Sequence, residues 1–300
     1  MIEFKQIEMN DKKWIAPLLD AAGMHGCQYN FTNIFAWANV YNYRVAQLEN
    51  HLIVKGQDQE ETPQYFYPAG SGGNIKSVIE AMTEDAANCN TEFILAGLSK
   101  ENVEEVNSLF PDKFNFTERR DSFDYVYLLD KLVTLAGRDF SAKRNHINNF
   151  KKNNIWSFEL ITPENLAECW AMNVEWCKTH GCLYNDQLND ENCAVRRCFD
   201  YYTELGLEGG LIRSDGKVIA YTMGDKLNSD TYDIHVEKAM EEIQGAYQMI
   251  NREFAAYILD KNPELLYVDR EEDMGQEGLR KSKMSYHPYR LEEKYWGKYE

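Results

Sequence analysis

The sequence lacks several features that mark common protein classes. No apolar run approaches the roughly 20 residues that a membrane-spanning helix needs. Residues 1–5 have neither the basic region nor the apolar stretch of a signal peptide. A serine–histidine–aspartate pattern, an HExxH motif and a Walker loop are also missing, so nothing supports a hydrolase or a nucleoside triphosphatase. These absences predict a protein without a membrane span that stays in the cytoplasm.

Basic charge is scarce. The chain has 32 lysine and arginine residues against 49 aspartate and glutamate residues, which gives a net charge of −17. Such an excess repels a polyanion at long range, which argues against a protein that coats nucleic acid. It remains compatible with one local basic groove that binds an RNA.

The cysteines do not form a known metal-binding pattern. There are seven, an odd number, and no CxxC pair. In the cytoplasm they are expected to be reduced thiols. Five lie between Cys169 and Cys198 with His180 among them, but the CxxxxC spacing is not that of a known zinc knuckle, so no metal site is expected.

The chain is long enough for two domains, and the pattern of predicted elements occurs twice. With 300 residues, of which 44% are hydrophobic, two ordinary cores can form. A predicted hairpin at 43–54 is matched by a stronger one at 211–221, where Asp215-Gly216 separates two β-branched runs. Asp215 lies 166 positions after Glu49.

Each hairpin is followed by the same series of predicted elements. A short strand and a small-residue loop precede an amphipathic helix, an apolar strand, a further helix and a last strand. Leaving out the further helix, the segments in this order are 64–67, 68–73, 75–86, 92–96 and 125–129 in the first half. In the second half they are 231–236, 242–245, 246–258, 265–269 and 289–291. We therefore predict two domains, 1–135 and 136–300, of which the second begins with a basic helix near 138–152.

This order of elements resembles the GNAT (acyl-CoA N-acyltransferase-like) fold. It implies an α+β protein made of two tandem GNAT-like domains with mixed sheets. The strings GRDFSAKRN (137–145) and GLRKSK (278–283) resemble the phosphatidylglycerol lysyltransferase C-terminal domain family. The string YNFTNIFAW (29–37) is similar to the entrance helix of its stand-alone bacterial members.

The resemblance spans nearly the whole chain and implies a reaction class. Members of known activity are related to the Fem-type ligases, which move an aminoacyl group from a charged tRNA to an acceptor. The membrane-spanning half of the lysyltransferases has no counterpart in this sequence, which argues against a lipid acceptor.

One candidate cofactor-binding loop is Gln244-Gly245-Ala246-Tyr247. A glycine before a helix exposes backbone N–H groups that bind an anion, and the matching loop of GNAT enzymes holds the cofactor pyrophosphate. The loop has one glycine and follows an acidic run, 237–242, which makes coenzyme A less expected than aminoacyl-tRNA. Alternatively, Gly245 only permits close packing at a helix start. The glycine-rich loop 68–73 is an equivalent cradle or a flexible turn.

Two residues are candidates for proton transfer. Asp269 ends an apolar strand, where a rigid sheet presents side chains, and a carboxylate can accept the proton of an attacking amine. Tyr286 is placed by the GNAT resemblance where a tyrosine protonates the leaving group, although a core role is the alternative. His235 is expected to make an ordinary polar contact and not to act as a base.

Two cationic clusters are candidates for substrate binding. Lys143 and Arg144, with the neighbouring Asn145, lie in the first family-like string, whereas Arg280 and Lys283 share one face of a short helix. They would hold a phosphate or carboxylate. The alternative is surface pairing with acids, such as Arg280 with Glu277.

These observations predict acyl transfer, most specifically of an aminoacyl group from an aminoacyl-tRNA to an amine or hydroxyl of a small-molecule or peptide acceptor. One alternative is a coenzyme A-dependent N-acyltransferase. A second is a non-catalytic ligand- or RNA-binding module with a degenerate site.

Overall fold

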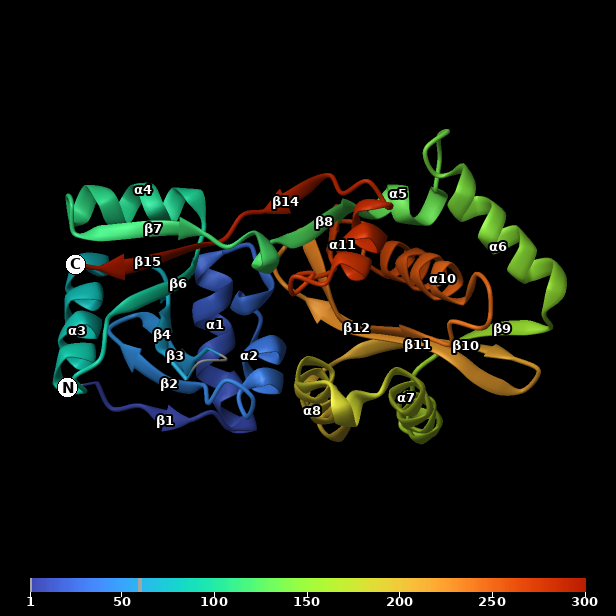
Figure 1. Cartoon of the computed structure of the whole chain (residues 1–300), viewed down its shortest axis with the longest axis horizontal. Helices are drawn as coiled ribbons and strands as arrows, with labels where there is room; N and C mark the ends of the chain where they lie inside the picture. Colours follow the sequence, from blue (N-terminus) through green and yellow to red (C-terminus); the bar gives the residue numbers. More distant parts are fainter. Residues whose placement is uncertain (1, 59–60) are drawn as a thin grey trace. The chain divides into compact units, whose positions relative to one another are not determined.

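The computed structural model describes residues 2–58 and 61–300 and contains two compact units (Figure 1). Unit 1 comprises the described residues up to Asp124, together with Glu272–Arg280 and Leu291–Glu300. Unit 2 comprises Tyr125–Glu271 and Lys281–Arg290. No helix in the described ranges combines the length and apolar character that crossing a bilayer requires.

Unit 1 is built on an eight-stranded mixed sheet. Its strands are β1 (Lys5–Gln6), β2 (Arg44–Leu48), β3 (His51–Gln57), β4 (Pro63–Phe66), β5 (Ala69–Gly70), β6 (Ile94–Leu98), β7 (Phe114–Glu118) and β15 (Tyr295–Tyr299). Its helices are α1 (Lys12–Ala22), α2 (Phe31–Trp37), α3 (Ile75–Asn88) and α4 (Lys100–Leu109), with 3-10 turns η1 (Met9–Asp11), η2 (Cys27–Tyr29) and η3 (Arg120–Ser122). The order is β1-β2-β3-β4-β6-β15-β7, and β5 pairs with β3.

The core of unit 1 forms where α3 and α4 cover this sheet. Val78, Ile79 and Met82 of α3 pack against Tyr65 and Leu95 of the parallel pair β4 and β6. Their helical spacing matches the amphipathic pattern predicted for 75–86.

Unit 2 is built on a seven-stranded sheet. Its strands are β8 (Asp124–Leu128), β9 (Trp156–Leu160), β10 (Glu208–Ser214), β11 (Lys217–Lys226), β12 (Thr231–Ala239), β13 (Tyr267–Asp269) and β14 (Arg290–Glu292). Its helices are α5 (Leu129–Thr134), α6 (Ser141–Asn153), α7 (Leu166–His180), α8 (Asp186–Asp200), α9 (Tyr202–Leu205) and α10 (Ala246–Lys261), with η4 (Cys182–Tyr184). Helix α11 (Glu277–Met284) has residues in both units.

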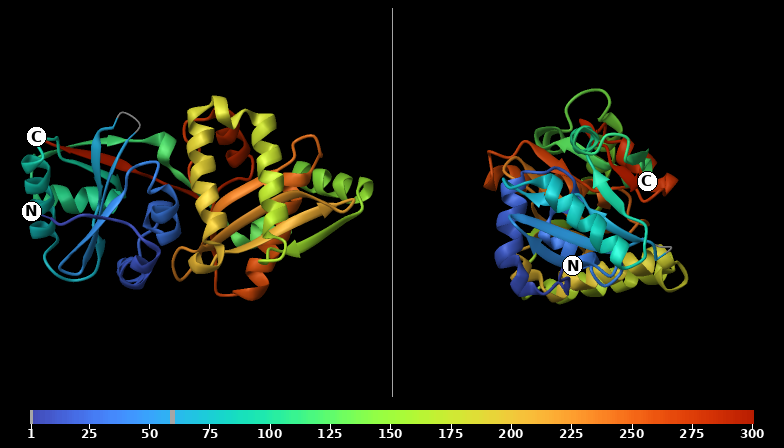
Figure 2. Two further views of the ribbon diagram at one scale, coloured as in Figure 1. Left: turned by 90° about the horizontal axis from the view of Figure 1, so that it is seen from below. Right: turned by 90° about the vertical axis from the view of Figure 1, so that its left-hand side faces the viewer.

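Helices cover both faces of the sheet of unit 2. Helix α10 packs on β10, β11 and β12, and α6 packs against α10. Helices α7 and α8 lie side by side on the opposite face (Figures 1 and 2). The predicted turn of the central hairpin is confirmed, because Asp215 and Gly216 have φ of 48° and 80° between β10 and β11.

The two sheets share one strand order. In unit 2 the order β9-β10-β11-β12-β13-β8-β14 follows that of unit 1, and the fourth and fifth strands are the parallel pair in both. The sixth position is exchanged between the halves of the sequence. The C-terminal strand β15 lies between β6 and β7, and β8 from the first half lies between β13 and β14.

Because of this exchange, the compact units do not coincide with two continuous halves of the sequence. Segments 125–129 and 289–291, predicted as the last strand of each half, are both strands, but both belong to the sheet of unit 2. Strands β7 and β15 have no counterpart in the sequence prediction. The domain boundary at residue 135 stays a prediction about the sequence repeat, because each compact unit contains segments from both halves of the sequence.

The prediction that all cysteines are free thiols is wrong for one pair. Cys177 and Cys182 form a disulfide, with their Cα atoms 5.1 Å apart. Helix α7 ends at His180, and Gly181 adopts φ of 70°, so the chain turns back and brings the two thiols together.

Candidate functional site

A β-bulge in unit 2 places His235 at the centre of a buried ionic cluster. Val236 lies opposite Met223 and Ile234 opposite Gly224, so His235 is an extra residue of β12 without a position opposite it in β11. A bulge of this kind locally twists a strand and re-aims its side chains, and bulges are frequent next to active sites.

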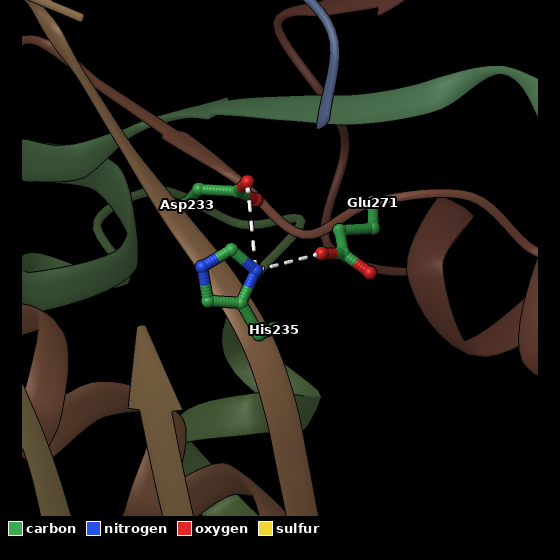
Figure 3. Close-up of side chains that lie close together, drawn as sticks. All are labelled: Asp233, His235 and Glu271. Carbon is green, nitrogen blue, oxygen red and sulfur yellow. Dashed lines mark hydrogen bonds and ion pairs between the residues drawn. The ribbon is translucent and has the colours of Figure 1, made fainter. Parts of the chain in front are cut away.

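Three carboxylates surround the imidazole of His235. Its Nε2 lies 3.0 Å from Asp225 Oδ1. Its Nδ1 lies 3.0 Å from Glu271 Oε1 and 3.6 Å from Asp233 Oδ2 (Figure 3). We call Asp225, Asp233, His235 and Glu271 the histidine cluster. The His235 side chain is only 5% exposed. With both nitrogens protonated, each N–H donates to a carboxylate.

The charge of His235 follows from these neighbours. Burial opposes a charged imidazole, but the nearby carboxylates of Asp233 and Asp225 outweigh it and raise the pKa of His235 well above its usual value. One atom each of Asp233, His235 and Glu271 could ligate a metal, since all three lie within 4.8 Å of one another. Because the imidazolium already neutralises part of this negative charge, we interpret the group as an ion-paired cluster.

A second cluster is centred on Arg270, directly after β13. The guanidinium donates to Glu237 Oε1 at 2.8 Å, and Asn251 of α10 donates to the other oxygen of Glu237 at 3.1 Å. Arg270 also lies over the rings of Tyr286 and Tyr127, with its Cζ 5.0 Å and 5.6 Å from their centroids. The aromatic rings shield the ion pair from water, which strengthens it.

Lys143 of α6 belongs to the same cluster. Its Nζ lies 3.8 Å from the centroid of the Tyr286 ring and donates to Ser285 Oγ at 2.7 Å. Burial lowers the pKa of Lys143 to about 8, and the charge of Arg270 adds to this effect. We call Lys143, Glu237, Arg270 and Tyr286 the arginine cluster. It brings together two basic side chains, a carboxylate and a phenol, which can hold an anion and transfer protons.

The two clusters meet where the parallel strands part. β12 and β13 pair only from Thr231↔Tyr267 to Asp233↔Asp269, and β12 continues to Ala239. Arg270 and Glu271 follow β13 immediately and provide one member of each cluster.

Two predicted residues hold this turn in place. The Asp269 carboxylate accepts the Glu271 N–H at 2.8 Å and is 1% exposed. Lys283 Nζ donates to the carbonyls of Arg270 and Glu271 at 2.6 and 3.0 Å. Both side chains therefore fix the backbone that carries Arg270 and Glu271.

The predicted cofactor loop starts α10, and close packing explains its glycine. Gly245 has φ of 91°, and a Cβ there would lie 2.6 Å from the carbonyl oxygen of His146 in α6. Ala246 is buried and Gln244 is exposed. The Tyr247 hydroxyl accepts from Trp176 Nε1 at 3.3 Å, and burial raises the pKa of Tyr247 to about 12.

The other predicted cations are occupied elsewhere. Arg144 donates to the carbonyls of Leu135 and Gly137 and so caps the turn before α6. Asn145 is exposed on α6. In unit 1, Arg280 pairs with Asp273 and Asp121, so the structure shows the expected kind of pairing with acids but with other partners than Glu277.

Sequence reasoning missed Glu237, Arg270 and Glu271 as site residues. A signal was present, because Asp233, His235 and Glu237 put three ionisable side chains at alternate positions of one strand.

Comparisons with known proteins agree with this architecture. The family model for the phosphatidylglycerol lysyltransferase C-terminal domain matches residues 20–297. The chain belongs to this family. A conserved protein of unknown function from Bacteroides thetaiotaomicron is 36% identical, with a TM-score of 0.94 over 100% of both chains. No curated protein matches the sequence.

More distant structures share the fold. L-PGS from Bacillus licheniformis is 14% identical, with a TM-score of 0.66 over 96% of this chain and 92% of its own. FemX is 10% identical, with a TM-score of 0.63 over 99% of this chain and 97% of its own. The predicted family and the predicted fold class, α+β with tandem GNAT-like domains and mixed sheets, are thus confirmed.

Proposed function

We propose that the protein transfers an aminoacyl group from an aminoacyl-tRNA to an amine or hydroxyl of a small-molecule or peptide acceptor. The family and the fold shared with FemX support acyl-transfer chemistry. The observation that carries the proposal is the arginine cluster, which concentrates opposite charges and a phenol at the point where β12 and β13 part.

The cluster offers a group for each step of the reaction. As the acceptor nitrogen bonds to the ester carbonyl, its proton passes to Glu237, and the ester carbon–oxygen bond to the ribose breaks. Arg270 and Lys143 stabilise the developing oxyanion, because fixed charges in a poorly solvated site need little reorganisation. Tyr286 returns a proton to the ribose oxygen. Asp269 positions the turn that carries Arg270.

The segment that leads into and through α6 provides the charge for binding an RNA. Residues 138–152 contain five basic residues (Arg138, Lys143, Arg144, Lys151 and Lys152) and one acidic residue, Asp139, in a chain of net charge −17. Lys151 and Lys152 are exposed. A helix of this charge attracts tRNA phosphates locally although the protein as a whole repels them.

The start of α10 gives less support to coenzyme A as donor. The glycine that would cradle a pyrophosphate is required by the approach of α6, since its added Cβ would collide with His146 O. We therefore place coenzyme A second, as the donor of the alternative N-acyltransferase.

A transfer assay tests the proposal. The protein is incubated with tRNA charged with labelled amino acids, or with labelled acyl-coenzyme A, and a panel of amines. Glu237→Gln should lower turnover about 10²–10⁴-fold, the usual contribution of a general base. Glu264→Gln, in the exposed pair of Glu264 with Lys226, is the matched control and should leave turnover unchanged.

The outcomes separate the three functions. Transfer from acyl-coenzyme A but from no charged tRNA would overturn the choice of donor. Transfer from neither, with tRNA still bound, would identify a binding module. Neutralising Lys151 and Lys152 together should also reduce the slope of log Kd against log salt by about one for each phosphate group that the variant no longer binds.

A further inference from the structure

Unit 1 contains a buried lysine in contact with a cysteine thiol. Lys294 Nζ lies 3.4 Å from Cys27 Sγ and 2.8 Å from Asp124 Oδ1. The thiol lies 3.4 Å from the same carboxylate oxygen, and the Cys27 N–H donates to the other one at 2.9 Å. All three residues are at most 5% exposed. An amine, a thiol and a proton acceptor are thus held together with little access to water.

The contact joins distant parts of the chain. Cys27 lies in η2 near the N-terminus, and Lys294 directly precedes β15, the C-terminal strand of the sheet of unit 1. Asp124 is the last residue of unit 1 before the chain enters unit 2. A covalent bond between Cys27 and Lys294 would anchor β15 to the N-terminal segment.

We propose that Cys27 and Lys294 form an N–O–S bridge under oxidising conditions. Molecular oxygen is the oxidant: the thiol, the neutral amine and O₂ give S–O–NH and one water molecule. One oxygen atom enters the bridge and the other leaves as water, so sulfur and nitrogen together lose the four electrons that O₂ gains. Lys294 first passes its ammonium proton to Asp124, which it contacts.

Burial favours the bridge over other oxidation products. A thiolate near solvent proceeds to sulfinic acid or to mixed disulfides with dissolved thiols. Cys27 is 5% exposed, and the amine is the nucleophile that the structure places against its sulfur. A second lysine–cysteine contact provides an internal comparison: Lys55 Nζ lies 3.7 Å from Sγ of Cys89, which is exposed.

Mass spectrometry of the full-length protein tests the proposal. The Cys89→Ser variant, which removes the exposed contact, is incubated in oxygen-saturated buffer. We expect a mass gain of one oxygen atom less two hydrogen atoms, reversed by dithiothreitol. Peptide mapping should recover one cross-linked species that contains Cys27 and Lys294, and adding Cys27→Ser or Lys294→Arg should abolish it.

The peptide map of Cys89→Ser itself decides the question if these further substitutions prevent folding. Recovery of Cys27 as a free thiol, or as a sulfinic acid with an unlinked Lys294 peptide, would overturn the proposal. The Cys177–Cys182 disulfide lies in other peptides and changes mass only by two hydrogens, so it cannot be mistaken for the bridge. In the bridged protein, amide hydrogen exchange in β15 should slow relative to the reduced form.

Discussion

Replacing Asp124 tests whether its ion pair with Lys294 stabilises unit 1. The side chains of Asp124 and Lys294 are 0% and 4% exposed, so Asp124→Asn leaves the buried ammonium group with only the more distant carboxylate of Glu272, at 4.0 Å. Breaking a buried pair in this way costs about 3–5 kcal/mol. Asp124→Ala also removes the acceptor of the Cys27 N–H, which adds about 1–3 kcal/mol. Both losses involve one carboxylate, so their sum is an upper limit.

Chemical unfolding followed by far-ultraviolet circular dichroism measures these differences. The double variant Asp124→Asn/Lys294→Met buries no charge and should recover most of the stability lost in Asp124→Asn. Lys298→Met, in the exposed pair of Lys298 with Glu92, should change the free energy of unfolding by less than about 1 kcal/mol. If Asp124→Asn is as stable as Lys298→Met, or if the double variant is no better than Asp124→Asn, the argument fails.

Three further predictions concern unit 2. Because the pKa of His235 is raised, its protonated imidazole stabilises the folded state fully below pH 6.5, and this stabilisation is lost as pH rises through the folded-state pKa. The destabilisation caused by His235→Gln should therefore shrink at alkaline pH, and a pH-independent difference in unfolding free energy would contradict this. Since the pKa of Lys143 is about 8, the affinity for an anionic donor should fall as pH rises through 8 in the wild type but not in Lys143→Arg; parallel binding profiles would exclude this role. Gly245→Ala should destabilise the protein by more than Gly216→Ala. Gly216 has a similar φ of 80° but open space around the new Cβ, so its substitution costs about 1–3 kcal/mol from backbone strain alone. Equal thermal shifts would show that α6 moves away to accommodate the new Cβ at residue 245.

Local patterns in the sequence were sufficient to predict most of the central elements. The amphipathic period of 75–86 gives α3, and Asp215-Gly216 sets the turn between β10 and β11 because its residues tolerate positive φ. Both signals depend on neighbours within one element, which a sequence displays directly.

Long-range pairing was not visible in the sequence. β15 is the segment Tyr-Trp-Gly-Lys-Tyr, which does not alternate clearly, and both of its partners precede it by more than 170 residues. Strand propensity says that such a segment can pair but not with which strand. The exchange of β8 and β15 therefore had no local signature.

The candidate site likewise contains residues that the sequence predicted and residues whose position depends on long-range pairing. Lys143 was predicted from the string GRDFSAKRN and Tyr286 from the GNAT resemblance, and the structure brings them together, with Nζ 3.8 Å from the ring centroid. Their partners Glu237 and Arg270 were not predicted, because their meeting depends on the register of β12 against β13. A one-residue bulge at His235 reverses which side chains of β12 face α10, and bulges leave little trace in composition.

Backbone pairing alone does not explain why the strands are exchanged. β15 pairs antiparallel with β6 in one sheet, and β8 pairs antiparallel with β13 in the other. Either strand could therefore form similar backbone hydrogen bonds in either position. One buried ion pair next to the strands favours the observed arrangement. Lys294 precedes β15, Asp124 begins β8, and the buried bond between them forms within unit 1 when β15 lies between β6 and β7. Since an unpaired buried charge costs several kcal/mol, this pair opposes any arrangement that separates its members.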